Sequence, residues 1–217
     1  MYKYAIGVIM ALLSLSAKSE GNFTISSGEA GTPYYEVAQE IKNYIEAVIP
    51  STHVYVSESS GSVENMSRLK RGLTDLVISQ QNIALDYYYN EENHFSNFEV
   101  VLPLFPEALQ IVVAGNSTAL SFNELTELIK SKKVNSMYVG FEGGATHMLI
   151  KSIFSIFGVS LSDGFFKFGT VSKAMQGVEN STIDVFAYVA GFPSITIQNA
   201  LKYGSLVTIE SILFSFK

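Results

Sequence analysis

The chain of 217 residues contains no cysteine. Without thiols it cannot use a cysteine nucleophile, a cysteine-based zinc site or the lipid-modified cysteine of a bacterial lipoprotein. It cannot form disulfides either, so an exported form of the chain would depend on its hydrophobic core for stability. A chain of this length can bury such a core as one large domain or as two small lobes.

Arginine is almost absent, since Arg68 and Arg71 are the only two. Asp and Glu number 20 against 14 for Lys and Arg, which gives a net charge of −6. A nucleic-acid-binding protein needs a basic stripe, so this composition argues against nucleic acid as a partner. A small anion buried by this chain would need several backbone donors at once, because an unpaired buried charge is costly.

Signatures of common catalytic and metal sites are also missing. No P-loop, dinucleotide-binding fingerprint or G-x-S-x-G elbow occurs, and His53, His94 and His147 lack metal-ligand spacing. We therefore expect no metal, no cofactor and no catalytic residue. We interpret His147 as a surface residue of a helix, with ligand contact or pH sensing as the alternatives.

No hydrophobic run is long enough to span a membrane. The longest apolar run near the start, Ala5–Leu15, follows Lys3 and precedes the triplet AKS at 17–19. A basic start, a short apolar run and a small-x-small triplet are typical of a secretory signal peptide. We predict that residues 1–19 are removed, which leaves 198 residues with a net charge of −8. A buried N-terminal helix is the alternative.

Glycine is concentrated in two similar loops, Gly28–Tyr35 (GEAGTPYY) and Gly140–His147 (GFEGGATH). Each follows a short apolar run and opens an amphipathic helical pattern. Glycine turns let the backbone approach a ligand, and a helix start offers unpaired N–H groups and a partial positive charge to an anion. Two such loops predict a small acidic solute held from both sides, provided that the loops face each other. An ordinary strand-to-helix turn is the alternative for each.

Predicted strands and helices alternate along the chain, which indicates parallel sheets flanked by helices in two small α/β lobes. We expect the strand 108–114 to cross from one lobe to the other, and Ser121 and Glu124 to form a capping box. A duplicated lobe and the general similarity of βαβ units explain the repeated order equally well. Strands are predicted at 23–27, 53–58, 75–79, 108–114, 137–140, 166–170, 184–189 and 206–209, and helices at 34–48, 62–72, 82–89, 121–132, 148–157, 172–178 and 193–203.

Five motifs in this order resemble the TAXI-type solute-binding proteins that serve tripartite ATP-independent periplasmic (TRAP) transporters. The resemblance covers about residues 23–210 and implies a two-lobed type II periplasmic-binding fold. It places the lobes at 20–106 and 107–210, with a tail at 211–217. The motifs are GEAGTPYYEVAQEI from Gly28, SSGSVENMSRLKRGLTDLVISQQN from Ser59, LFPEALQIVVAGNS from Leu104, GFEGGATHMLI from Gly140 and IDVFAYVAGFPSITIQNAL from Ile183.

The resemblance implies a periplasmic receptor, not an enzyme, that closes on a small organic anion such as glutamate or another carboxylate. The loaded receptor, a monomer, would deliver this solute to the membrane subunits of a TRAP transporter. An enzyme on the same fold, acting on a small carboxylate, is one alternative. The other is a truncated fragment without function, because the family continues beyond the position that matches Leu206–Glu210 and returns to complete its first lobe.

The candidate binding residues lie in the glycine loops and at strand ends. Gln80 follows a predicted strand, where parallel sheets bind their ligands, although a solvated strand end is the alternative. Of Tyr34 and Tyr35, one should face the core and the other the ligand, whereas Asp75 and Asp184 are interpreted as orienting turns. The second loop, which we expect to mirror the first, has Gly-Gly-Ala-Thr where the TAXI family usually has Gly-Ser-Gly-Thr. The candidates are Gly28, Gly31, Thr32, Tyr35, Ser60, Gly61, Ser62, Gln80, Gly143, Gly144, Thr146 and Gly191.

Overall fold

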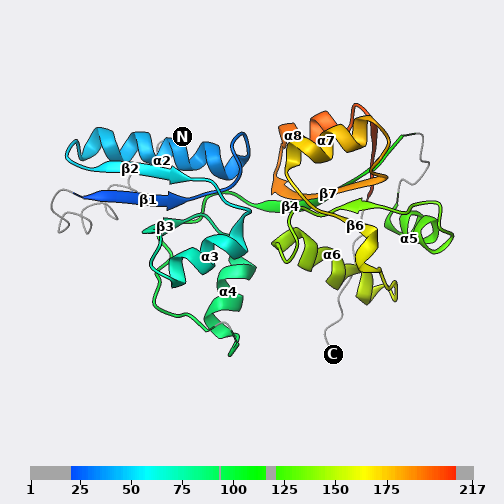
Figure 1. Cartoon of the computed structure of the whole chain (residues 1–217), viewed down its shortest axis with the longest axis horizontal. Helices are drawn as coiled ribbons and strands as arrows, with labels where there is room; N and C mark the ends of the chain where they lie inside the picture. The colour runs from blue at the N-terminus through cyan, green and yellow to red at the C-terminus, as the bar shows by residue number, and fades with distance from the viewer. Residues whose placement is uncertain (1–20, 93, 116–120, 209–217) are drawn as a thin grey trace. The chain divides into compact units, whose positions relative to one another are not determined.

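The computed structural model describes residues 21–92, 94–115 and 121–208 (Figure 1). The predicted signal peptide and C-terminal tail lie outside these residues, as does the last residue of the predicted final strand. The chain divides between Pro106 and Glu107 into two compact units, each with its own sheet. No helix among the described residues is long and apolar enough to cross a membrane.

The first unit is built on a parallel three-stranded sheet in the order β2-β1-β3. The chain moves from β1 outward to β2 and then back to the other side of β1, so right-handed crossovers place α2 and α3 on opposite faces of the sheet (Figure 1). Tyr34, Ala38 and Ile45 of α2 pack on Ile25 and Val54 of the sheet. The elements are β1 (Asn22–Ser26), α2 (Pro33–Val48), β2 (His53–Ser57), α3 (Ser62–Lys70), β3 (Leu76–Val77) and α4 (Gln81–Tyr89).

The second unit has a five-stranded sheet in the order β6-β5-β7-β4-β8, covered by helices on both faces (Figure 1). Side chains alternate across this sheet: Ile111 and Val113 of β4 join the core under α5 and α6, and Val112 joins the core under α7 and α8. The elements are β4 (Glu107–Ala114), α5 (Phe122–Lys130), β5 (Met137–Tyr138), α6 (Ala145–Ile156), the 3₁₀ turn η1 (Asp163–Phe165), β6 (Phe166–Lys167), α7 (Val171–Glu179), β7 (Val185–Gly191), α8 (Ile195–Ala200) and β8 (Gly204–Leu206).

Strand β4 departs from the predicted pattern in two ways. It does not cross between units, because Glu107–Val113 pair along their whole length with β7 of the second sheet. It is also antiparallel to both of its neighbours, whereas β5 is parallel to β6 and β7. The reason is that β7 and β8, which α8 connects, are separated in the sheet by the width of one strand. β4 occupies the position between them and runs in the opposite direction to both.

The remaining predicted elements occur close to their expected positions, and the capping box of Ser121 and Glu124 on α5 is confirmed. The strands predicted at 75–79, 137–140 and 166–170 are shorter, with two residues each. In each case the chain leaves the ladder early and turns into the loop before the next helix. The last predicted helix is reduced to α8, and the final strand begins at Gly204.

Candidate functional site

The two units share one backbone arrangement. The order β2-β1-β3 in the first unit corresponds to β6-β5-β7 in the second, and each set of three strands is parallel and joined through two helices. In the first unit the three strands end side by side at Ser57, Ser26 and Val77, whereas in the second unit β7 continues to Gly191, five residues past Phe186, its last residue paired with β5. Parallel α/β sheets bind ligands at the carboxyl ends of their strands. We call the loops that follow these three strands the carboxyl edge of each unit.

The loop after β1 is a tight turn held by its own backbone and by one hydroxyl. Thr32 N–H donates to Glu29 O at 3.1 Å, and Gly31 between them has a left-handed φ of 79°. Thr32 is the N-cap residue of α2, yet its hydroxyl does not cap the helix and donates to Glu29 O at 2.7 Å. The proton of this hydroxyl therefore holds the turn and is not directed at a ligand.

The loop after β5 repeats this turn. Gly144 N–H donates to Phe141 O at 2.9 Å, Gly143 has a φ of 71°, and Gly144 is the N-cap residue of α6. The predicted mirror relation is thus correct for the two glycines, which occupy the positions of Gly31 and Thr32.

Thr146 does not mirror Thr32. It is the second residue of α6, which is the position of Tyr34 in α2. The second loop therefore has no hydroxyl to hold its turn, and Thr146 adds one in the first helical turn.

Several loop amides of the first unit already bind carboxylates of the protein itself. Ala30 N–H donates to Glu58 Oε2 at 2.9 Å, and Ser60 N–H donates to Glu64 Oε2 at 2.8 Å. The Ser60 hydroxyl donates to the same oxygen at 2.7 Å. These loops thus bind carboxylates of the protein itself, and their binding of an anionic ligand stays a prediction.

The first turns of two helices keep amides without a partner inside the helix. In α6 the first helical hydrogen bond runs from Met148 N–H to Gly144 O, so the amides of residues 145–147 have no acceptor one turn back. The same holds for residues 62–64 of α3. Together with the partial positive charge of a helix start, these amides are the anion donors that each carboxyl edge offers.

A buried asparagine joins the loops of the first carboxyl edge. Asn65 of α3 is fully buried, and its Nδ2 donates to Ser27 O after β1 and to Ile78 O after β3. Close by, Gln80 N–H donates to the Ser62 hydroxyl at 2.9 Å, which brings two of the predicted site residues together. Within the described residues, Oδ1 of Asn65 is buried without a hydrogen-bond partner.

Arg68 belongs to the same edge and was not predicted to do so. Its guanidinium donates to Glu64 Oε1 at 2.6 Å, to the Ser57 hydroxyl at 2.9 Å and to Glu58 O at 2.9 Å. Burial would raise the pKa of Glu64, but hydrogen bonds from Ser60 and Arg68 outweigh this effect, so the pKa is lowered. Glu64 stays ionised and pairs with Arg68. The four-residue spacing of the two on a predicted helix is the sequence signal for this pair.

His147 is buried at the second carboxyl edge, so the prediction of a surface residue is wrong. It is 8% exposed, and its ring meets those of Phe166 and Phe168 edge-on, with centroids at 4.7 and 5.0 Å. Gly143 N–H donates to Nδ1 at 3.1 Å, which assigns the proton of the neutral imidazole to Nε2. Nε2 is buried and has no partner among the described residues.

The surroundings of His147 favour its neutral form. Burial lowers the pKa of the imidazole, and the nearby charge of Lys151 lowers it further. Glu142 and Asp163 act in the opposite direction, but their effect is smaller. The histidine therefore keeps Nδ1 free of a proton and able to accept from the glycine turn.

The second carboxyl edge carries a phenylalanine in each of its three loops. Phe141 follows β5, Phe168 follows β6 and Phe192 follows β7; Phe168 is 39% exposed and Phe192 is 85% exposed. In the first unit the positions of Phe141 and Phe168 are taken by Glu29 and Glu58. The two edges thus differ in chemistry although they share a backbone.

The structure groups the predicted residues by unit. Tyr34 packs in the core below α2 and meets the ring of Phe105 at 6.3 Å, so of the two tyrosines it is Tyr35 that lies outside this core. Asp184 Oδ2 accepts Asn135 N–H in the segment before β5, as expected of a residue that orients a turn, and Asp75 Oδ2 accepts Thr24 N–H of β1. The first edge contains Gly28, Gly31, Thr32, Tyr35, Ser60, Gly61, Ser62 and Gln80, and the second contains Gly143, Gly144, Thr146 and Gly191.

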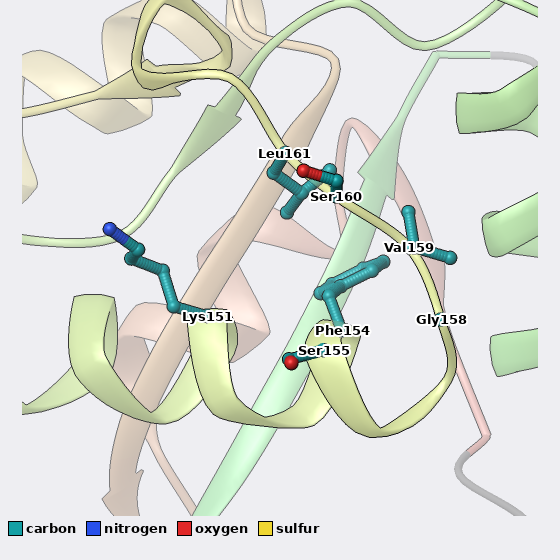
Figure 2. Close-up of a pocket in the computed structure, with 7 residues that line it drawn as sticks. All are labelled: Lys151, Phe154, Ser155, Gly158, Val159, Ser160 and Leu161. Carbon is teal, nitrogen blue, oxygen red and sulfur yellow. The ribbon is translucent and has the colours of Figure 1, made fainter.

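Elsewhere in the second unit, a pocket of about 340 Å³ lies beside the C-terminal half of α6, and its lining residues are drawn in Figure 2. It lies at the opposite end of this helix from Gly144, and no predicted site residue lines it. The residues that line this pocket are Lys151, Phe154, Ser155, Gly158, Val159, Ser160 and Leu161.

In the part of the chain that the structure describes, no group of His, Asp and Glu could hold a metal ion.

The chain belongs to the NMT1-like family, which matches residues 25–211. Solved structures share its fold. The alkanesulfonate-binding protein SsuA from Xanthomonas axonopodis pv. citri, bound to MOPS, is 15% identical with a TM-score of 0.54 over 88% of this chain and 62% of that one. The effector-binding domain of QuiR in complex with shikimate is 16% identical, with a TM-score of 0.57 over 89% of this chain and 83% of that one.

A structure from the glutathione import system of Streptococcus mutans, which involves GshT and the cystine importer TcyBC, is 12% identical with a TM-score of 0.58. It matches over 89% of this chain and 78% of that one. The likenesses confirm the predicted α/β fold of the type II periplasmic-binding kind. The chain spans less than two thirds of the length of the SsuA and BugD structures that it matches.

Proposed function

We propose that this member of the NMT1-like family is a binding protein for a small organic anion and not an enzyme. The observation that carries the proposal is the repeated carboxyl edge, which in each unit combines a glycine turn with a helix start whose first amides have no helical partner. Glu58 and Glu64 support it further, because they show that carboxylates suit the loop amides of the first unit. We propose that each edge can bind the acid group of such a ligand.

The ligand class rests on the donors available. Arg68 is already paired with Glu64, so the anion would be held by amides and hydroxyls and not by a guanidinium. Among proteins of the same fold, SsuA binds MOPS and QuiR binds shikimate, and both of these ligands carry an acid group. An amino acid such as glutamate, or another carboxylate, is the proposed solute.

The proposed role is capture and delivery. The TAXI resemblance supports a monomeric receptor that passes its solute to the membrane subunits of a TRAP transporter. The predicted signal peptide supports a periplasmic location. The assignment of residues 20–106 and 107–210 as the two lobes of such a receptor belongs to the same proposal.

Calorimetry on the purified chain tests the proposal with a panel of carboxylates. We expect Thr146→Ala to weaken binding by about 1–3 kcal/mol, the range for a hydrogen bond to a charged group. Thr182→Ala is the matched control, because Thr182 precedes β7 at the far end of the strand and bonds to Gly177 O. An affinity that is unchanged in Thr146→Ala would remove this hydroxyl from the site.

Thr32→Ala separates a structural role from a binding role. Because the Thr32 hydroxyl donates to Glu29 O, we expect this variant to lose stability as well as affinity, whereas Thr146→Ala loses affinity alone.

Mass spectrometry of small molecules recovered with the protein distinguishes a receptor from an enzyme. Recovery of the unaltered solute supports the proposal, and its conversion into a product contradicts it.

A further inference from the structure

A segment of the first unit exposes apolar side chains together with its backbone. It comprises residues 99–104 (EVVLPL), which follow α4 and are drawn in Figure 1 without helix or strand. We propose that this segment, called the open strip below, binds an extended segment of another protein by strand pairing. The partner carries lysine or arginine beside its apolar residues. This interaction goes beyond ligand capture, because what binds is a protein.

The side chains of the open strip are not covered. Val100 is 80% exposed and Val101 is 53% exposed, and Leu102 and Leu104 are exposed as well. Single apolar residues at a surface are ordinary, but several in one place mark interaction sites. Neighbouring side chains of an extended chain point to opposite sides, so the exposure of both valines shows that the strip is open on both.

The main chain of the open strip is also unpaired. Residues 94–106 contain no turn or bend, and residues 96–106 make no backbone hydrogen bond with any residue that the structure describes. Pro103 favours an extended conformation at Leu102 before it. An extended backbone with free N–H and C=O groups is a template for a further strand, and proteins commonly bind extended segments by pairing of this kind.

Both ends of the strip are fixed by aromatic contacts. Phe98, directly before it, meets Tyr88 of α4 edge-on, with ring centroids 6.2 Å apart. Phe105, directly after it, meets Tyr34 of α2 with ring centroids 6.3 Å apart. A template that is held at both ends loses little conformational entropy when a partner pairs with it.

The charge around the strip selects the partner. From the start of α4 to the end of the first unit the chain has no lysine or arginine but four acidic residues, Asp86, Glu91, Glu92 and Glu99. None of these carboxylates forms an ion pair within residues 21–92, 94–115 and 121–208. A second copy of the chain would bring the same acidic residues against this surface, and like charges repel. Basic residues beside the apolar ones of a partner complement it.

Fluorescence anisotropy with labelled peptides tests the inference on the full chain. The probe is the peptide KKVTVTVKK, which has a strand-forming centre between lysines. We expect the peptide EEVTVTVEE to bind at least about tenfold more weakly, because its charges have the same sign as those around the strip. We expect no binding of KKVTVTVKK with N-methylated valine and threonine amides, because this form keeps the side chains and cannot pair as a strand.

Proline substitutions distinguish strand pairing from apolar contact. Neighbouring N–H groups point to opposite edges of a strand. We therefore expect either Val100→Pro or Val101→Pro to weaken binding of KKVTVTVKK at least about tenfold, and the other to weaken it much less. Val100→Ala and Val101→Ala are the controls, because they shorten the side chain and keep the N–H. Circular dichroism establishes that each variant is folded.

A charge reversal tests the choice of a basic partner. We expect Glu99→Lys to narrow the difference in affinity between KKVTVTVKK and EEVTVTVEE. Glu40→Lys, at an exposed position of α2, makes the same change of charge outside the strip and should leave the difference as it is in about 0.15 M salt.

Four outcomes overturn the inference. The first is that KKVTVTVKK does not bind, or binds no better than EEVTVTVEE. The second is that the proline and alanine variants bind alike. The third is that sedimentation shows self-association that a proline variant abolishes, which makes a second copy the occupant. The fourth is that the peptide IESILFSFK, which copies residues 209–217, binds more tightly than KKVTVTVKK, which makes this segment the occupant. None of these outcomes affects the proposed binding of an anion.

Discussion

The carboxyl edges of the two units have the same backbone and different side chains. Both have a glycine at left-handed φ in the turn, an N-cap residue that bonds back across that turn, and a helix that begins directly after it. The first edge is lined with Glu, Ser and Asn, and the second with Phe and His. The arrangement of strands therefore provides the place for a ligand, and the loops decide which ligand fits.

The contrast extends to the residues that hold the loops together. Asn65 makes the first helical hydrogen bond of α3, and Ala174 makes the corresponding bond of α7. Asn65 bridges two strand ends by its amide, whereas Ala174 is 2% exposed and packs in an apolar core. The first edge is thus cross-linked by a buried side-chain amide. The loops after β5 and β6 of the second edge are joined instead by Gly169 N–H, which donates to Gly140 O at 3.0 Å, and by the Tyr138 hydroxyl, which donates to Gly169 O at 3.0 Å.

The largest expected effect comes from replacing Asn65 of the first edge by alanine, the residue that occupies the corresponding position of α7 in the second unit. We expect Asn65→Ala to lower the free energy of unfolding by about 3 kcal/mol, because two buried carbonyls lose their donor and a cavity remains. Urea denaturation followed by circular dichroism measures this change. Asn82→Ala, at an exposed position of α4, should change the stability by less than about 0.5 kcal/mol. A variant Asn65→Ala as stable as the parent would contradict the cross-linking role.

A smaller effect distinguishes the two aspartates at corresponding positions. Asp184 Oδ2 accepts from Asn135 N–H, Ser136 N–H and the Ser136 hydroxyl, and Asp75 Oδ2 accepts from Thr24 N–H at an exposed position. We expect Asp184→Ala to cost about 2 kcal/mol and Asp75→Ala about 1 kcal/mol. Asp184→Asn should recover part of the loss, because its amide oxygen can still accept. Equal losses at the two positions in thermal denaturation would show that the edges do not differ here.

The smallest expected effect is a pH dependence confined to the second edge. The pKa of His147 is lowered in the folded protein from its ordinary value of 6.5, so the unfolded chain binds more protons in weak acid. The stabilisation by neutral His147 is therefore fully present above about pH 6.5 and is lost as the pH falls through the lowered pKa. Protonation would also break the hydrogen bond that Nδ1 accepts from Gly143 N–H.

Melting temperatures at about pH 7.5 and about pH 5.5 check this sign. We expect His147→Gln to show a smaller drop between the two values than the parent chain. His53→Gln is the control, because His53 is exposed and lies 3.3 Å from Glu46. An unchanged drop in His147→Gln would assign the acid sensitivity to other groups.

The glycine turns could be predicted because their signal is local. A glycine before a helical pattern, a proline in the first turn of α2 and an acidic residue ahead of a strand all act on neighbouring backbone, so the turns and Asp184 were found from sequence. Arg68 was missed because its partners Ser57 and Glu58 lie on another element, which brings them close only in the folded chain.

His147 and β4 show the limit of local patterns. The helical periodicity of α6 does not reveal that Phe166 and Phe168 cover one histidine, because those rings come from a different strand. The hydrophobic run of β4 indicates a buried strand, but its direction depends on the space between β7 and β8.

The order of strands and helices, the glycine turns and the absence of any cysteine chemistry can all be read from the amino-acid sequence, since each of these depends on neighbouring residues or on composition. Pairing in the folded chain settles which loops share an edge, which amides already have partners and which of the two edges is aromatic. These properties depend on pairing between distant segments, where a hydrogen bond or a ring contact forms only after the strands have been placed side by side.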